Sequence, residues 1–274
     1  MESFFSFLEK RVDDCSSLLC IGLDPHVNDL SAATAEAARD FCLNIVKQTS
    51  RYAVAFKPNA AFFEVFGAEG WTALKQVIDA IQEESRRLGS LIPVILDAKR
   101  GDIASTAEAY AKSAFENLGV HGITLSPYLG KDSIEPFIQN SEKGVFLLCK
   151  TSNAGSGDLQ DIVLSDGDLL YEHVAKLAQA WNTKNNIGLV VGATHLDAIK
   201  RVRAAAPDLW FLAPGVGAQG GELESALKAG LRKDSKGMLI PVSRGIARAE
   251  KLGVAAAEMR DEILAIRSSI TGIR

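Results

Sequence analysis

Two lysines and two aspartates carry the chemistry that this sequence suggests. Asp97 and Lys99 stand two residues apart at the end of an apolar run, Asp102 follows after a turn that contains a glycine, and Lys57 ends another apolar run. On an extended strand, residues two apart point to the same side. If the ends of these runs meet, ammonium and carboxylate groups alternate and keep one another charged. Such a fixed field can stabilise charge that develops on a reacting molecule.

A structural role is the alternative for part of this cluster. Asp102 could be the N-cap of a helix that begins near Ile103, because aspartate is a preferred capping residue. Lys99 and Arg100 could be solvated cations of a loop. The combination of Asp97, Lys99 and Asp102 directly after a fully apolar strand favours a functional site over these alternatives.

Eight short apolar runs, separated by stretches long enough for helices, predict repeated βα units and a parallel sheet. Their nearly continuous apolar character is typical of strands that are covered on both faces. The runs span residues 17–24, 53–58, 92–97, 122–126, 144–150, 187–192, 209–213 and 238–243. A barrel and an open doubly wound sheet both fit this pattern.

Two observations favour a single (β/α)8 barrel, the TIM barrel, with its active site at the C-terminal ends of the strands. The first is the number of runs, and the second is that polar residues such as Asp24, Lys57 and Ser126 lie where the runs end. In a barrel these ends converge on one mouth. The first run lacks the GxGxxG pattern of a dinucleotide-binding sheet. We expect residues 1–274 to form one domain, closed by a helix over residues 247–270.

The composition narrows the possible partners and the location. A net charge of −4 gives no basic field for nucleic acid. The four cysteines show no CxxC spacing and the four histidines show no metal-ligand spacing, so we expect reduced core cysteines and no metal. The N-terminus does not resemble a signal peptide, and no uncharged apolar run could span a bilayer. We therefore expect a cytoplasmic protein without a membrane partner.

A second candidate site lies after the last two runs. The glycine-rich segment 215–221 follows the seventh run, and Arg244 and Gly245 follow the eighth. Barrels commonly hold a phosphate at these two places. Glycines allow the backbone to approach an anion closely, Gln219 can donate a hydrogen bond, and Arg244 can bind a dianion through two bonds. The glycine-rich segment alone could be an ordinary turn, but its pairing with Arg244 favours an anion site.

The segment from Asp97 to Thr106 resembles the D-x-K-x-x-D-[IV]-x-x-T signature of the orotidine 5′-phosphate decarboxylases. The similarity extends over nearly the whole chain and is strongest to the longer, bacterial-type subgroup. Further similar segments are Ile21-Gly22-Leu23-Asp24-Pro25, Phe56-Lys57-Pro58-Asn59, Ser126-Pro127-Tyr128-Leu129-Gly130 and Lys150-Thr151-Ser152-Asn153.

This resemblance implies a decarboxylase that converts orotidine 5′-monophosphate to uridine 5′-monophosphate and carbon dioxide in de novo pyrimidine synthesis, without a metal or other cofactor. It implies that Lys57, Asp97, Lys99 and Asp102 form the alternating catalytic tetrad of the family. Lys99 would donate a proton to C6 of the pyrimidine after carbon dioxide leaves. Charge stabilisation by a fixed cation would then take the place of an electron-accepting cofactor.

The resemblance also implies a homodimer in which Asp102 and Thr106 act in trans, in the partner's site. Asp24 matches the residue that hydrogen-bonds the ribose, and Ser152 matches the one that contacts the pyrimidine. The remaining substrate-binding residues, at the phosphate, are Gln219, Arg244 and Gly245.

Two other functions remain open. The metal-dependent sugar-phosphate synthases and decarboxylases of the same barrel group share a D-x-K-x-x-D segment, but they carry an acidic residue at the end of the second strand, where Lys57 would repel a metal. A non-catalytic protein that binds nucleotide phosphates would keep Arg244 and the glycine-rich segment. It would not need Lys57, Asp97 and Lys99 together.

Overall fold

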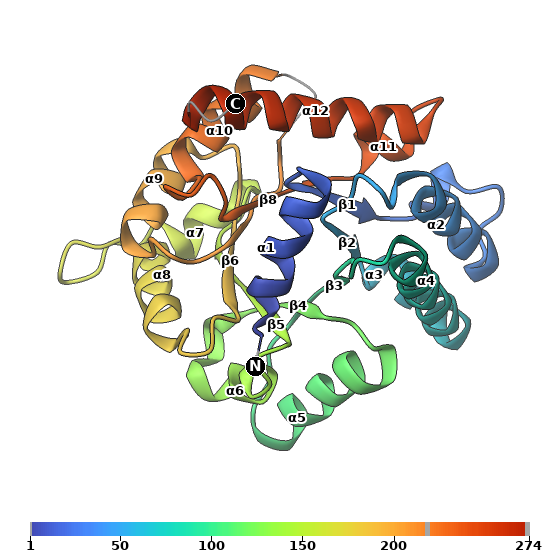
Figure 1. The fold of residues 1–274 in the computed structure, drawn as a ribbon. Helices are drawn as coiled ribbons and strands as arrows, with labels where there is room; N and C mark the ends of the chain where they lie inside the picture. The colour runs from blue at the N-terminus through green and yellow to red at the C-terminus, as the bar shows by residue number, and fades with distance from the viewer. Residues whose placement is uncertain (1, 217–219, 272–274) are drawn as a thin grey trace.

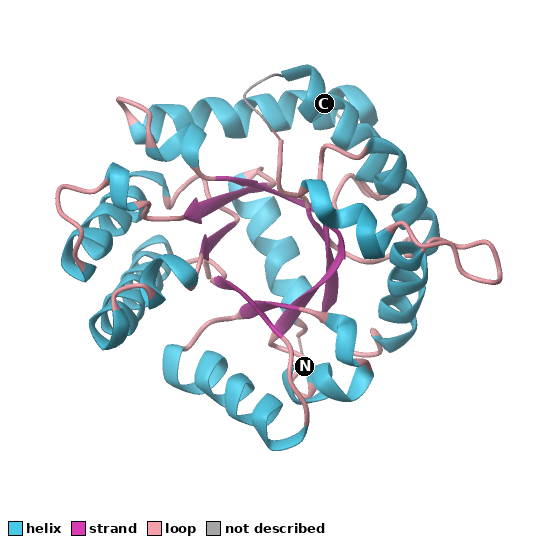
Figure 2. Cartoon of the chain, turned by 180° about the vertical axis from the view of Figure 1, so that it is seen from behind, coloured by secondary structure: helices cyan, strands magenta, loops and turns pink. Residues whose placement is uncertain are grey.

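A ring of parallel strands surrounded by helices forms the molecule, as Figures 1 and 2 show. This computed structural model describes residues 2–216 and 220–271. The strands lie in the order β2-β1-β8-β7-β6-β5-β4-β3. They are β1 (Leu19–Leu23), β2 (Ala55–Pro58), β3 (Ile95–Arg100), β4 (Gly122–Leu125), β5 (Gly144–Lys150), β6 (Ile187–Val191), β7 (Phe211–Leu212) and β8 (Met238–Val242).

The ring closes between β2 and β3 through isolated bridges rather than through a continuous ladder. Phe56 pairs with Val94 and Asn59 pairs with Asp97, both in parallel. The backbone N–H of Phe56 donates to the carbonyl of Pro93 over 3.0 Å. The predicted (β/α)8 barrel is therefore confirmed, and the open doubly wound sheet is wrong.

The strand ends differ from the predicted ones by a few residues. The fifth strand has the predicted bounds, whereas β7 is reduced to Phe211–Leu212. The largest difference that affects the site is in β3, which begins three residues later than predicted and runs on to Arg100. Lys99 thus belongs to the strand and not to the loop that follows it.

The helices cover the outside of the strand ring, and their apolar faces form one continuous core with the strands. The predicted closing helix is confirmed as α12, preceded by the short α11. The helices are α1 (Phe4–Cys15), α2 (Ala35–Thr49), α3 (Ala61–Glu64), α4 (Gly67–Leu88), α5 (Ala104–Lys112), α6 (Lys131–Ile138), α7 (Gly157–Gln160), α8 (Leu170–Trp181), α9 (Leu196–Ala205), α10 (Gly220–Gly230), α11 (Arg244–Ala247) and α12 (Leu252–Thr271).

Helix α1 lies across the end of the barrel at which the strands begin (Figure 1). The Phe5 ring stacks on the Trp210 ring at a centroid distance of 6.0 Å and meets the Phe146 ring edge-on at 5.6 Å. A Cβ atom at Gly144 would lie 2.2 Å from the Phe4 ring, so β5 needs glycine at this position. Burial of these rings, including that of Trp210, closes the barrel floor.

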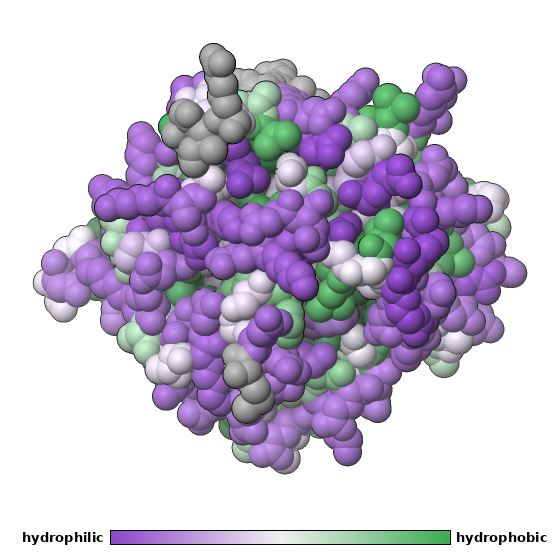
Figure 3. Space-filling model, in the orientation of Figure 1, coloured by the Kyte–Doolittle hydropathy of each residue, from purple (hydrophilic) through white to green (hydrophobic). Residues whose placement is uncertain are grey.

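The outer surface of this floor is mostly hydrophilic (Figure 3). No helix in residues 2–216 and 220–271 is both long enough and apolar enough to cross a membrane.

Candidate active site

A buried ion pair lies where β2 and β3 end. The Nζ of Lys57 is 2.7 Å from Oδ2 of Asp97, and the two side chains are only 9% and 12% exposed. The parallel bridge between Asn59 and Asp97 brings these strand ends together. Lys57 and Asp97, which are forty residues apart in the chain, therefore meet as the sequence predicted.

Lys99 joins the pair from the other side of the carboxylate. Its Nζ lies 2.5 Å from Oδ1 of Asp97, and its side chain is half exposed. The expected simple strand alternation is wrong, because Lys99 has a φ of +48° and the pairing with β4 shifts register between Leu96 and Arg100. The two side chains meet, but they do so from an irregular backbone rather than from a regular strand. A left-handed backbone at a non-glycine residue is strained and needs support from its surroundings.

Thr124 of β4 supplies that support, and the sequence analysis did not identify it. Its hydroxyl oxygen accepts from the backbone N–H groups of Ala98 and Lys99, over 3.0 and 2.9 Å. The same hydroxyl donates to Oδ1 of Asp97 over 3.1 Å. The available signal was a hydroxyl inside an otherwise apolar strand, next to the strand that carries the charged residues.

The charges in this cluster stabilise one another. Burial by itself raises the pKa of Asp97, but the neighbouring ammonium groups of Lys57 and Lys99 lower it to about 2. Burial likewise lowers the pKa of Lys57, and the carboxylates of Asp97 and Asp24 outweigh this effect and raise that pKa above its usual value. At neutral pH the site therefore presents a carboxylate held between two ammonium groups.

Asp102 and Thr106 do not join this cluster within one chain. Asp102 is half-buried and accepts a hydrogen bond from the backbone N–H of Ile103 over 2.8 Å. Helix α5 begins at Ala104 with Ile103 as its N-cap residue and no side-chain cap, so the helix-cap alternative is wrong. Among the described residues no hydrogen bond or ion pair joins Asp102 to Lys57 or Lys99. Thr106 is exposed.

A cavity of about 720 Å³ opens beside Lys57 at the same end of the barrel. The Oδ1 atom of Asp24 is buried there and has no hydrogen-bond partner among the described residues. A Cβ at Gly22 would come within 2.8 Å of Ser243, so glycine lets β1 approach the β8 end closely. The lining residues also include His26, Gly215, Arg244, Gly245 and Met259.

Arg244 and Gly245 are exposed at the start of α11, on the wall of this cavity. Gly215 also lines this cavity and has a φ of +98°, a conformation that glycine adopts without strain. Gln219 lies outside the described residues. The two predicted phosphate-binding segments thus meet at one cavity, as far as the structure describes them.

Ser152 follows β5 and lies near the ends of β6 and β7. A Cβ atom at Gly192 would be 3.0 Å from the Cβ of Ser152, and one at Gly215 would be 3.8 Å from it. The predicted site residues of strands one, two, three, five and eight therefore gather at one end of the barrel. Asp102 and Thr106 follow β3, but no hydrogen bond or ion pair of the described residues joins their side chains to this group.

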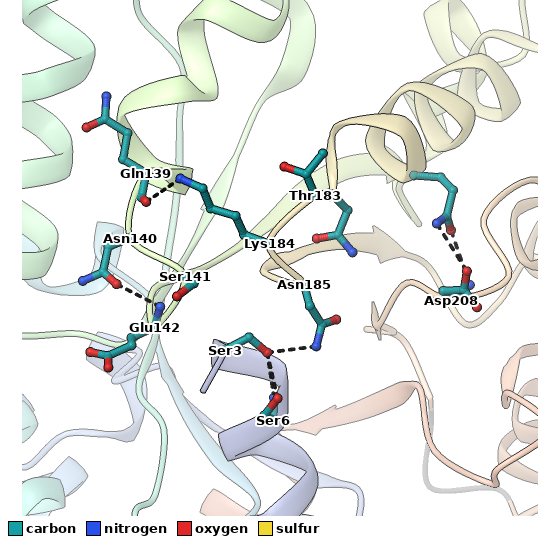
Figure 4. A pocket seen from close by; sticks show the side chains of 12 residues that line it. Ser3, Ser6, Gln139, Asn140, Ser141, Glu142, Thr183, Lys184, Asn185 and Asp208 are labelled. Carbon is teal, nitrogen blue, oxygen red and sulfur yellow. Dashed lines mark hydrogen bonds between the residues drawn. The ribbon is translucent and has the colours of Figure 1, made fainter. Parts of the chain in front are cut away.

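A larger, polar cavity lies at the opposite end, and Figure 4 shows its side chains. It is built from the loops that precede β5, β6 and β7, together with the start of α1. Its polar groups bind one another: Asn185 Nδ2 donates to the Ser3 hydroxyl over 2.8 Å, and Lys184 Nζ donates to the carbonyl of Gln139 over 2.6 Å. These lining groups thus satisfy one another's hydrogen bonds, whereas the Oδ1 atom of Asp24 at the mouth has no partner among the described residues.

Within residues 2–216 and 220–271, no three His, Cys, Asp or Glu side chains come together in a way that could hold a metal ion. At the end of β2, the cationic group of Lys57 occupies the place where the metal-dependent alternative would carry an acidic ligand.

Known proteins resemble this chain over nearly its full length. Residues 17–259 match the family described as orotidine 5′-phosphate decarboxylase / HUMPS. The orotidine 5′-phosphate decarboxylase of Roseiflexus castenholzii is 47% identical over 98% of this chain and 97% of its own, and that of Roseiflexus sp. strain RS-1 is 50% identical over 93% and 92%. The solved Leishmania donovani OMP decarboxylase has a TM-score of 0.87 and 54% identity, covering 97% of this chain and 99% of its own.

Proposed function

The chain belongs to the orotidine 5′-phosphate decarboxylase / HUMPS family, and from this membership we propose that it removes carbon dioxide from orotidine 5′-monophosphate to form uridine 5′-monophosphate. The enzyme is a carboxy-lyase of pyrimidine synthesis, like the relatives that carry the decarboxylase name. The observation that favours this activity over metal-dependent chemistry is the Lys57, Asp97 and Lys99 cluster at the barrel mouth.

Lys99 acts as the proton donor in the proposed mechanism. The bond between C6 and the carboxylate breaks, carbon dioxide leaves, and the electron pair of that bond stays on C6. The proton on Nζ of Lys99 then forms the new C6–H bond, and the resulting amine recovers a proton from water. Because Asp97 lies 2.5 Å from this Nζ, the ammonium is already oriented before charge develops.

Asp97 has two proposed roles. It is ionised at neutral pH, since its pKa of about 2 is set by Lys57 and Lys99 against the opposing effect of burial. It therefore holds both ammonium groups in place. It is also a like charge beside the substrate carboxylate, and loss of carbon dioxide relieves that repulsion.

Other residues in and near the cavity bind the ribose, the phosphate and the pyrimidine of the substrate in this proposal. The unpaired oxygen of Asp24 is available to a ribose hydroxyl, which would satisfy it. Arg244 and Gly245 bind the phosphate together with Gln219, and Ser152 contacts the pyrimidine. Binding energy from the phosphate can then be used to orient the distant reacting carbon.

We propose that the enzyme is a homodimer in which Asp102 and Thr106 complete the partner's site. Among the described residues Asp102 makes no hydrogen bond or ion pair with the charged cluster of its own chain, and Thr106 is exposed. Exposed apolar side chains suited to a subunit contact accompany them, since Ile103 is 53% and Tyr128 is 80% exposed. The intact tetrad would then consist of three residues from one chain and Asp102 from the other.

Two further proposals concern the chain as a whole. Residues 1–274 form one domain, which is supported by the single core that α1, the barrel strands and α12 share. The enzyme works in the cytoplasm. The four cysteines are buried and free, which suits a reducing compartment.

The activity is tested by following the absorbance of orotidine 5′-monophosphate with and without a metal chelator. We expect turnover under both conditions, and a loss of at least about 100-fold in Lys99→Ala because a general acid is removed. Lys131→Ala is the matched control, since Lys131 is equally exposed and its ion pair is with Glu135 on the same helix, α6. Absence of turnover in the wild type would overturn the proposal, and activity that the chelator abolishes would support the metal-dependent alternative.

A further inference from the structure

A buried lysine outside the charged cluster, Lys150, binds the segment that follows β5. We propose that Lys150 is a positioning residue for the pyrimidine side of the cavity, and that it acts through an ion pair with Asp161 on the segment that carries Ser152. This inference rests on the proposed function, because it takes Ser152 as the residue that contacts the base.

Lys150 is the last residue of β5, and its side chain is 5% exposed. Its Nζ lies 2.6 Å from Oδ1 of Asp161 and 3.2 Å from the hydroxyl of Ser156, and it faces the Tyr171 ring at 5.8 Å from the centroid. These partners lie on the following loop and on α8, so the ammonium points away from the cavity, whose lining does not include it. A buried charge is costly unless it is paired, and this requirement fixes where Asp161 can lie.

The ion pair closes residues 151–160 into a loop, and a second link tightens the loop next to Ser152. Oε1 of Gln160 accepts from the backbone N–H of Thr151 over 2.9 Å. Nε2 of the same side chain donates to the Thr151 hydroxyl over 2.9 Å. Gln160 directly precedes Asp161. The ion pair between Asp161 and Lys150 therefore also keeps Gln160 next to Thr151, the neighbour of Ser152.

The barrel wall supports Ser152 from the other side. The backbone N–H of Gly192 donates to the carbonyl of Lys150 over 2.7 Å, and Gly192 has no room for a Cβ beside Ser152. Ser152 is thus fixed between the β6 end and a loop whose position depends on Lys150. A shift of this loop would move Ser152 while leaving the charged cluster and the phosphate side of the cavity in place.

The two partners differ in what their removal leaves behind. Lys150→Met leaves Asp161, which is 47% exposed and can be hydrated by solvent. Asp161→Asn leaves an ammonium group buried without its counter-charge, which is the more destabilising change. Lys150→Met is therefore the variant that releases the loop with the smaller effect on folding.

The test compares two ligands that differ in the base. Equilibrium titrations followed by NMR give the affinities for uridine 5′-monophosphate and for ribose 5-phosphate, which lacks the pyrimidine. We expect Lys150→Met to weaken the nucleotide about tenfold, a loss comparable to that of one hydrogen bond to the base, and to leave ribose 5-phosphate within about twofold. A general loss of structure would weaken both ligands equally and would overturn the inference, as would unchanged nucleotide affinity.

Two further variants complete the experiment. If Lys150 acts through Asp161, the double variant Lys150→Met/Asp161→Asn binds the nucleotide no more weakly than Lys150→Met, whereas additive losses contradict the inference. Gln160→Met removes the second link without removing a buried charge and should show the same selective loss, even if Lys150→Met does not fold. Lys176→Met is the control, because Lys176 pairs with Asp168, which lies outside residues 151–160 and just before α8. Turnover of orotidine 5′-monophosphate by the wild type is measured separately. Failure of the proposed function can therefore be distinguished from failure of the proposed role of Lys150.

Discussion

Oδ2 of Asp97 accepts a hydrogen bond from Nζ of Lys57 over 2.7 Å, and almost no solvent reaches either side chain. The two groups are not equally supported. Asp97 also has Lys99 and Thr124 as partners, whereas within the described residues the Lys57 ammonium donates a hydrogen bond only to Asp97.

Asp97→Asn should therefore destabilise the protein more than Lys57→Met does. The first change removes the carboxylate that is hydrogen-bonded to a buried ammonium and leaves it only the electrostatic attraction of Asp24, which costs about 3 kcal/mol. The second change leaves a carboxylate that still has Lys99 and Thr124 as partners. Urea denaturation measures both free energies of unfolding. Asp79→Asn, which breaks a surface pair with Lys75, is the control and should cost less than about 1 kcal/mol. An equal loss of unfolding free energy in all three variants would contradict the conclusion that Lys57 depends on Asp97 more than Asp97 depends on Lys57.

Thr124→Val should reduce activity as well as stability. The substitution keeps the volume but removes an acceptor for two backbone N–H groups and a donor to Asp97, so we expect a loss of about 2 kcal/mol in unfolding free energy. Decarboxylation should fall at least about tenfold as Lys99 loses its support. Thr49→Val removes another buried hydroxyl, one that bonds only within α2, and should lower stability without lowering kcat. An equal fall in kcat for both variants would contradict the role of Thr124 in supporting Lys99.

Mixed dimers test the proposed action of Asp102 in trans. We expect Lys99→Ala and Asp102→Ala each to lose nearly all activity, but a hybrid of the two contains one site with every tetrad residue intact. With free exchange of subunits about half of the dimers are hybrid, so the mixture should recover about a quarter of wild-type activity. Each variant mixed with itself is the control. If Asp102 served its own chain, no activity would return despite demonstrated exchange.

Acid should weaken the fold through His121. Burial, with a smaller contribution from Lys143, lowers the pKa of this imidazole from 6.5 to about 4, and its Nδ1 accepts from the N–H of Val94. Between pH 6.5 and pH 4 the imidazole is protonated in the unfolded chain but neutral in the folded chain. The contribution of His121 to the free energy of unfolding is therefore fully present above pH 6.5 and is lost as the pH falls toward 4. The loss should be on the order of 2 kcal/mol.

Unfolding free energies measured between pH 7 and pH 4 check this effect. The His121→Gln variant should show a shallower fall than the wild type over the same range. Parallel curves would mean that other groups cause the acid sensitivity.

The sequence predicted the elements of this fold well because strand periodicity and the position of polar residues are local signals. The convergence of Asp24, Lys57 and Asp97 at one mouth follows from the architecture, since all parallel strands of a barrel end on the same side. Their meeting thus required only the fold class and no knowledge of side-chain conformation.

The features that could not be predicted depend on contacts between distant strands. The left-handed backbone of Lys99 exists because Thr124 of the next strand binds two successive N–H groups, and no pattern within residues 97–102 shows this. The ion pair of Lys150 was equally hidden, because a lysine that ends an apolar run is usually solvated. Its burial becomes apparent only when the following loop folds over it.

The position of α1 also determines how further polypeptide could be attached. Ser3 is held at the barrel floor by its bond to Asn185, on the face opposite the cavity beside Lys57. A tag, a surface tether or a fused domain joined ahead of Ser3 would therefore emerge away from the mouth, and would leave substrate entry and the apolar surface around Tyr128 unobstructed.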